Sequence, residues 1–451
     1  MKKSTLIILV AAILIGAAAY YFDWKRGEKE AAKIPDDKSK LAFTFQPDEI
    51  RSLTISYPAD PKSQAVTFEK QNGAWQIIQP LQTGADSASL DGIVQGLAAA
   101  RTSESEPGTP DRLKVYGLTP PDVGLDFQLK NGAKHSVLLG KKDFTGDSVY
   151  AVVDHGTSVA LLPEALLVSS DKPLQVLRDR SVLHLDPANV RSFGLKNASG
   201  EISATRENGE AAAWNFVKPA ASPADADATN FLISAIANAK FVSVESESAD
   251  NLARYGLASP AITFTAADAK GQSATLLVGK KDADEYFARD TSRPTIFRIN
   301  QDLYKKLAQS YSDLRSKKIS ANLDPAAITR AEIHNASGTI VCSRKGEGEW
   351  SFEEPTDQKG KSASLEKLFT ALDQARSDQI IDHPGADIAA KFTKPAFEVV
   401  LTGKDGQKIT ISISKESGDF VYARNSESPA VYKLKKQILD TLNFKPSDLA
   451  F

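Results

Sequence analysis

A tryptophan followed five residues later by a proline occurs three times in this chain of 451 residues, at nearly equal intervals. The copies run from Trp75 to Pro80, from Trp214 to Pro219 and from Trp350 to Pro355. Because the chain holds only four tryptophans, this regularity is typical of a tandem repeat and not of chance. Each repeat is close to the usual size of one domain, so the motif predicts three similar modules.

The segment after each motif carries residues at helical spacing. They follow the i, i+3, i+4, i+7 pattern of one helix face and are apolar except for one threonine: Leu90, Ile93, Val94 and Leu97; Thr229, Leu232, Ile233 and Ile236; Leu365, Leu368, Phe369 and Leu372. This pattern predicts one amphipathic helix in each module. A basic residue follows each stripe, at Arg101, Lys240 and Arg376, and we expect it to face the negative end of the helix dipole.

Strand and turn patterns surround that helix. Each module begins with a turn, such as Asp186-Pro187, and continues with three strands, of which the third carries the tryptophan. Alternating apolar runs after the helix indicate about four more strands, and a closing helix follows. The sequence therefore predicts an α+β fold, with each module a mostly antiparallel sheet with about two helices. The predicted modules are residues 42–182, 183–320 and 321–451.

Two further motifs occur in the first two modules and are weakened in the third. Tyr-Gly-Leu stands at 116–118 and 255–257, and Gly-Lys-Lys-Asp stands at 140–143 and 279–282. The second motif lacks the upstream glycine and the following serine or threonine of a phosphate-binding loop, so we interpret it as a hairpin loop. Contact with an anion is the alternative, and its surface residues would be Lys141, Lys142, Lys280 and Lys281.

Residues 5–22 form an uncharged run rich in leucine, isoleucine and alanine. As a helix the run would be about 27 Å long, close to the ~30 Å hydrocarbon core of a bilayer. Aromatic residues at 20, 21 and 24 fall where an interfacial belt belongs. We expect a single transmembrane anchor, with residues 1–4 in the cytoplasm, a linker at 23–41 and the modules outside the cytoplasmic (inner) membrane, in the periplasm. A cleaved secretory signal is the alternative.

Composition argues against several classes of function. Lysine and arginine total 55 and aspartate and glutamate total 57, without a long basic block, so we expect no nucleic-acid partner. The one cysteine, Cys342, lies in a strand pattern and is interpreted as a packed side chain rather than a reactive thiol. The five histidines share no repeat position and form no zinc spacing. We therefore predict no catalytic, metal-binding or cofactor-binding residues, and no cofactor.

One pair of residues could be mistaken for a catalytic site. His184 stands two residues before Asp186, but the equivalent residue in the third module is Asn322, whereas the Asp-Pro step is kept there. An aspartate before a proline is typical of a turn, where its carboxylate accepts backbone N–H groups. We interpret Asp186 as a structural cap rather than a catalytic acid.

Together, the Trp-x4-Pro strand, the Tyr-Gly-Leu turn, the Gly-Lys-Lys-Asp hairpin and the Leu-Arg pairs at 177–178 and 314–315 resemble the bacterial family called domain of unknown function 4340. The resemblance covers nearly everything after residue 42 and is weaker in the third module. It implies single-pass anchored proteins with one or more copies of the domain, often encoded beside ABC-transporter subunits. It carries over no catalytic residue.

These observations favour a non-enzymatic, membrane-anchored accessory or scaffold protein whose partners are the permease or auxiliary proteins of an ABC-type transporter. An envelope protein that binds a glycan, lipid or peptide between modules is the first alternative. An envelope hydrolase is the second, because a chain with 57 carboxylates can form an acid pair that its sequence does not reveal.

Overall fold

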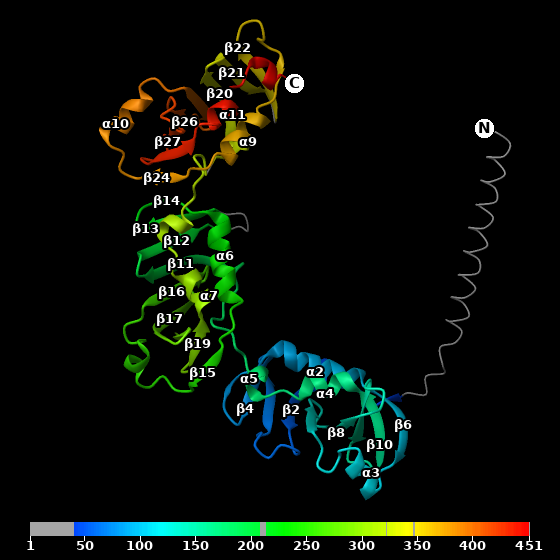
Figure 1. Ribbon diagram of the computed structural model, residues 1–451. Coiled ribbons are helices and arrows are strands. Elements are labelled where there is room, and N and C mark those ends of the chain that lie inside the picture. The colour runs from blue at the N-terminus through cyan, green and yellow to red at the C-terminus, as the bar shows by residue number, and fades with distance from the viewer. Residues whose placement is uncertain (1–39, 208–212, 322, 346–347, 451) are drawn as a thin grey trace, which may run out of the picture. The chain divides into compact units, whose positions relative to one another are not determined.

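The computed structural model describes residues 40–207, 213–321, 323–345 and 348–450 (Figure 1). The predicted anchor at 5–22 and most of the linker lie outside these residues. Within the described ranges, no helix is both long and apolar enough to cross a bilayer. The last residues of the predicted linker, Lys40–Leu41, form a short strand.

The first sheet has ten strands in the order β1-β6-β10-β9-β8-β7-β2-β3-β4-β5, and every pair is antiparallel. Its strands are β1 (Lys40–Leu41), β2 (Ile50–Ser56), β3 (Val66–Gln71), β4 (Ala74–Gln79), β5 (Thr83–Gly84), β6 (Arg101–Pro107), β7 (Val123–Leu129), β8 (Lys134–Lys142), β9 (Ser148–Val153) and β10 (Ser158–Pro163). Its helices are η1 (Pro47–Glu49), α2 (Ser87–Ala99), α3 (Pro110–Val115), α4 (Glu164–Ser170) and α5 (Leu174–Leu177). Figure 1 shows α2 and α4 side by side over the sheet.

The second sheet has nine strands in the order β14-β13-β12-β11-β16-β17-β18-β19-β15. Its strands are β11 (Val190–Asn197), β12 (Gly200–Arg206), β13 (Trp214–Lys218), β14 (Ser222–Pro223), β15 (Ser243–Ser246), β16 (Ile262–Asp268), β17 (Ser273–Asp282), β18 (Glu285–Asp290) and β19 (Ile296–Asn300). Its helices are α6 (Ala226–Ala237), η2 (Leu252–Tyr255), α7 (Gln301–Leu307) and α8 (Tyr311–Leu314).

The third sheet repeats this order as β23-β22-β21-β20-β25-β26-β27-β28-β24. Its strands are β20 (Ile328–Asn335), β21 (Gly338–Lys345), β22 (Glu349–Glu354), β23 (Ser362–Ala363), β24 (Gln379–Ile381), β25 (Phe397–Gly403), β26 (Lys408–Ile413), β27 (Phe420–Asn425) and β28 (Val431–Lys435). Its helices are η3 (Pro325–Ala327), α9 (Glu366–Gln374), α10 (Ala386–Ala389), η4 (Ala390–Phe392), α11 (Ile438–Leu442) and α12 (Pro446–Leu449).

Apart from β1, the three sheets have the same strand order, so the chain has a three-part α+β architecture with mostly antiparallel sheets. We call each sheet with its helices a module, numbered in chain order. Contacts among the described residues group them into two compact units that divide between Arg180 and Ser181, of which the first holds module 1 and the second holds modules 2 and 3. Each module has its own hydrophobic core.

The amphipathic helices predicted from the sequence are α2, α6 and α9. The predicted stripe is buried in each, including the single threonine, Thr229. Burial of these faces against the sheet stabilises each module by removing apolar area from water. The basic residues after the stripe, Arg101, Lys240 and Arg376, lie within two residues of the C-caps of α2, α6 and α9, in extended chain; their interaction with the helix dipole stays a prediction.

Candidate functional site

The repeated tryptophan occupies the same place in all three modules. Trp75, Trp214 and Trp350 are 2%, 1% and 6% exposed, and each belongs to the core of its module. The prolines that end the motif, Pro80, Pro219 and Pro355, all follow a cis peptide bond. The strand beside each motif has a bulge at the matching position. The motif is therefore one local structure built three times.

A basic side chain faces each tryptophan from the neighbouring strand. The cross-strand partners are Lys70, Arg206 and Arg344, and their charged groups lie 5.5, 4.8 and 5.0 Å from the indole centroid. A cation over an indole face is attracted by the negative face of the ring. This contact was not predicted from the sequence, although a basic residue stands shortly before each tryptophan.

The two arginines also bind the turn that opens their module. Arg206 donates to the carbonyl oxygens of Pro187 and Ala188, and Arg344 donates to those of Pro325 and Ala326. The Asp-Pro turn, the cation and the tryptophan thus form one packed unit. Its contacts stabilise the start of the module.

Modules 1 and 2 also satisfy the indole N–H. Trp75 Nε1 donates to Asp91 Oδ1 at 2.9 Å, and Trp214 Nε1 donates to Asn230 Oδ1 at 3.0 Å. The residue at the matching sequence position in module 3 is Glu366, the first residue of α9. Among the described side chains, none accepts a hydrogen bond from Trp350 Nε1.

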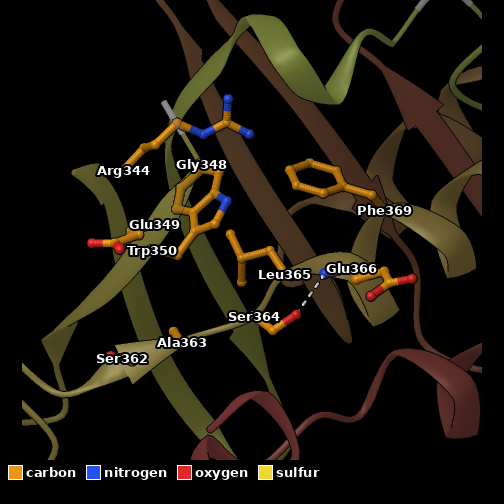
Figure 2. Close-up of a pocket in the computed structure, with 10 residues that line it drawn as sticks. All are labelled: Arg344, Gly348, Glu349, Trp350, Ser362, Ala363, Ser364, Leu365, Glu366 and Phe369. Atoms are coloured by element: carbon orange, nitrogen blue, oxygen red, sulfur yellow. Dashed lines mark hydrogen bonds between the residues drawn. The ribbon is translucent and has the colours of Figure 1, made fainter. Parts of the chain in front are cut away.

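A cavity of about 460 Å³ lies beside Trp350 (Figure 2). Leu365 and Phe369 form its apolar wall, and Ser364 and Glu366 line it at the start of α9. Figure 2 shows the indole nitrogen of Trp350 turned toward the space beside Leu365 and Phe369. This volume is within the usual range for sites that bind small molecules.

The Tyr-Gly-Leu and Gly-Lys-Lys-Asp motifs pack against each other. A Cβ atom on Gly140 would lie 2.3 Å from Tyr116 O, and one on Gly279 would lie 2.1 Å from Tyr255 O. Gly117 and Gly256 have positive φ angles of 69° and 71°. In module 3 the Tyr-Gly-Leu motif is replaced by Lys391-Phe392-Thr393, and Ser414 stands where the lysine motif begins, so neither motif keeps its glycine there. We conclude that the two motifs are one structural contact.

The four lysines do not lie in the loop that the sequence suggested. Lys141 and Lys142 are the last residues of β8, and Lys280 and Lys281 lie near the end of β17, because a bulge in each strand continues the pairing past the glycine. All four are exposed.

Three of these lysines have contacts within their own module. Lys142 Nζ pairs with Glu164 at 2.5 Å, and the stem of Lys141 lies over the turn at Gly117. Lys281 Nζ lies 6.0 Å from the Tyr286 ring. Anion binding by these lysines stays a hypothesis.

In module 1, a histidine and an aspartate lie within hydrogen-bond distance. His135 Nδ1 is 2.9 Å from Asp154 Oδ2, and the Ser136 N–H donates to Asp154 Oδ1. A carboxylate that orients a histidine is common in hydrolases. However, the equivalent residue in module 3, Ser426, also accepts a backbone N–H, from Thr410. The position therefore caps the end of a strand pair, and Asp154 has a structural role.

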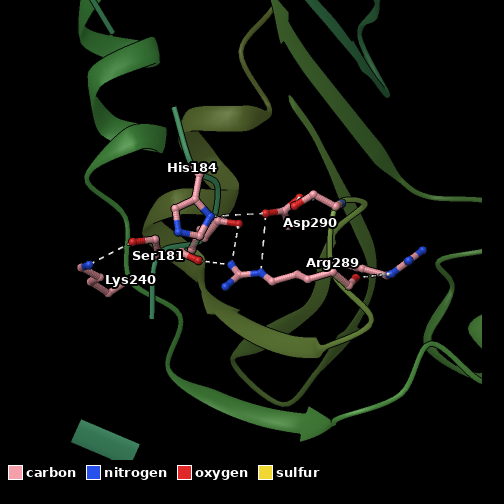
Figure 3. Close-up of polar contacts among 8 residues, drawn as sticks. Ser181, His184, Lys240, Arg289 and Asp290 are labelled. Atoms are coloured by element: carbon pink, nitrogen blue, oxygen red, sulfur yellow. Dashed lines mark hydrogen bonds and ion pairs between the residues drawn. The ribbon is translucent and has the colours of Figure 1, made fainter. Parts of the chain in front are cut away.

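A second polar cluster lies where the chain enters module 2 (Figure 3). Asp290 is 1% exposed, accepts from the N–H and hydroxyl of Ser292, and faces Arg293 Nε at 3.5 Å and His184 Nδ1 at 3.9 Å. Burial raises the pKa of Asp290, but the contacts with His184, Ser292 and Arg293 outweigh it, so the pKa is lowered overall.

The Asp290 cluster holds the entering chain against the sheet. Arg293 donates to the carbonyl oxygens of Ser181 and Val182. In module 3, Asn425 stands in the place of Asp290 and its amide donates to Ile319 O, in the matching part of the chain. This equivalence gives the buried carboxylate a structural function.

Asp186 and Cys342 have the roles that the sequence indicated. Asp186 accepts from the Ala188 N–H at 3.1 Å and from the Asn189 amide at 2.6 Å, as a turn cap does. Cys342 is buried on β21, where burial and the nearby Glu353 raise the pKa of its thiol to about 12. A thiol with that pKa is a poor nucleophile at neutral pH.

The internal equivalence of the modules agrees with comparison to known families. The sequence profile described as "Domain of unknown function (DUF4340)" matches residues 75–212, 214–391 and 350–450. The chain belongs to the DUF4340 family. Each of the three matched segments begins at one of the repeated tryptophans, and the last two segments overlap. A search of curated proteins finds no match. Membership of the DUF4340 family shows that the chain is related to these proteins, but it assigns no activity to the chain.

Proposed function

We propose that this protein is a non-enzymatic, membrane-anchored accessory subunit of an ABC-type transporter system, with its three modules outside the cytoplasmic membrane. The proposal rests on the use of the repeated residues. The tryptophan, the basic residue, the proline and the glycine recur because they stabilise the fold of the module. The repeated residues therefore have a structural role. Tandem frameworks on one chain are typical of proteins that offer an extended surface to partners.

One side chain supports a docking role directly. Phe144 is 96% exposed on the loop between β8 and β9. The loop is ordered by Asp143, which accepts from the Thr145 hydroxyl and from the N–H groups of Gly146 and Ser148. Exposed aromatic residues on an ordered loop are characteristic anchors of protein interfaces. In module 2 the corresponding turn, between β17 and β18, is shorter and carries Ala283 and Asp284.

The test is purification of the full-length protein from native membranes through a C-terminal tag. We expect transporter subunits to be recovered with the wild-type chain and to be reduced at least about tenfold by Phe144→Ser, as for loss of an interface anchor. The matched control is Phe231→Ser, which removes a 58% exposed aromatic from α6. Absence of transporter subunits from the wild-type sample would contradict the proposal.

A further inference from the structure

Module 3 differs from the other modules at the start of its principal helix. In α2 and α6 the helix begins three residues before the first position of the buried stripe, but α9 begins one residue after it. The chain between Pro355 and β23 is correspondingly longer than the links from Pro80 to β5 and from Pro219 to β14. In module 3 the loop after Pro355 is longer and the helix lacks the first turn that α2 and α6 have. The two differences cancel, so the number of residues between the tryptophan and the start of the stripe is the same in all three modules.

The missing turn leaves the helix start without its usual cap. Asp86 and Asp225 accept the N–H groups of Ser89 and Ala228 in modules 1 and 2. In module 3 the corresponding contact is a single bond of 3.5 Å from the Glu366 N–H to Ser364 Oγ (Figure 2). The first N–H groups of a helix are strong donors that need an acceptor.

A second donor faces the same cavity. The Trp350 side chain is only 6% exposed, and no described residue accepts a hydrogen bond from its Nε1. The Nε1 atom is open to the cavity, since it does not belong to the fully buried polar atoms without a partner among the described residues. A ligand oxygen in the cavity would meet this donor in the way that Asp91 and Asn230 do in the other modules.

The residues that line the cavity also indicate the apolar group and the charge of a ligand that would fit it. Leu365, Phe369 and the indole ring offer apolar walls, which suit a branched aliphatic or small aromatic group. Glu349 and Glu366 are exposed at the cavity, and Arg344 is the one cation among its lining residues. Arg344 Nη1 and Nη2 are bonded to the carbonyl groups of Ala326 and Pro325, and its Nε is buried without a partner among the described residues. Two carboxylates near the opening disfavour an anion.

We propose that module 3 binds a small, uncharged carbonyl compound, with an apolar group against Leu365 and Phe369 and its carbonyl oxygen accepting from Trp350 Nε1. Amides with a branched aliphatic side chain have this chemistry. The site lies within one module and does not depend on the transporter association, so the two proposals can fail separately.

The test uses the full chain labelled with ¹⁵N at tryptophan, titrated with N-acetyl-leucinamide. We expect the indole N–H signal of Trp350, assigned by its loss in Trp350→Phe, to shift in a saturable way while those of Trp75 and Trp214 stay unchanged. No shift up to about 10 mM ligand, or equal shifts of the Trp75, Trp214 and Trp350 signals, would overturn the proposal.

Two variants test the contacts. Trp350→Phe keeps the ring and removes the donor, so calorimetry should show affinity reduced about five- to tenfold, whereas the matched Trp214→Phe should leave it unchanged. N-acetyl-leucine, which carries a carboxylate, should bind with lower affinity than the amide. Glu366→Gln removes one of the two carboxylates at the cavity, so it should reduce this difference in affinity. Unchanged affinity in Trp350→Phe, or tighter binding of the carboxylate to the wild-type chain, would show that the assigned chemistry is wrong.

Discussion

At the residue scale, the repeated tryptophan owes its importance to three kinds of contact. Trp214 is packed in the core, its N–H is bonded to Asn230, and the Arg206 guanidinium lies over its ring. Removal of a large aromatic from a core costs both its burial and the cavity left behind.

Trp214→Ala should therefore lower the free energy of unfolding of module 2 by about 3–5 kcal/mol. Trp214→Phe keeps most of the burial and loses the hydrogen bond, so it should cost clearly less than the alanine variant. Urea denaturation of both variants measures the difference. A cost below ~1 kcal/mol for the alanine variant would mean that the indole is not part of the core.

The buried carboxylate of Asp290 makes a prediction about pH. Because its pKa is lowered in the folded protein, its contribution to stability is complete above the ordinary aspartate pKa of 3.8 and is lost as the pH falls through the lower, folded value. The difference in melting temperature between the wild-type chain and Asp290→Asn should shrink as the pH falls from neutral to about 2. A difference that stays constant over this range would contradict the assignment.

At the scale of elements, the sequence predicted those with a strong period and missed those without one. The faces of α2, α6 and α9 and the long strands follow from periods of 3.6 and 2. The two-residue strands β5, β14 and β23 have no period to detect. The cavity at Trp350 could not be predicted from the sequence. The loop of module 3 is longer and its helix is shorter by a similar number of residues, so the repeated positions stay aligned and the sequence shows no gap.

The paired glycine motifs give a prediction for one strand. Gly279→Ala should destabilise module 2 by about 2–4 kcal/mol, because the new Cβ would lie 2.1 Å from Tyr255 O and the backbone must move. The control is Gly92→Ala in α2, where an added Cβ meets nothing within 4 Å. Alanine there should be neutral or stabilise by up to about 1 kcal/mol. Thermal unfolding of the two variants compares them, and equal effects would contradict the packing argument.

At the scale of the whole molecule, the repeat implies that stability is divided among separate cores. Trp75, Trp214 and Trp350 belong to three different hydrophobic clusters, and the first unit of the chain ends at Arg180. Domains with their own cores unfold as units of their own when the contacts between them are few.

Calorimetry of the full chain should therefore show more than one unfolding transition. Trp75→Ala should lower the midpoint of one transition, since a loss of about 3–5 kcal/mol in a domain of this size shifts the midpoint by roughly 10 °C or more. The transitions that belong to Ser181–Phe451 should keep their midpoints, because the substituted side chain lies in the other unit. If the midpoints of all transitions shifted together, the chain would unfold as one cooperative unit. The modules would then be similar in structure without being independent in stability.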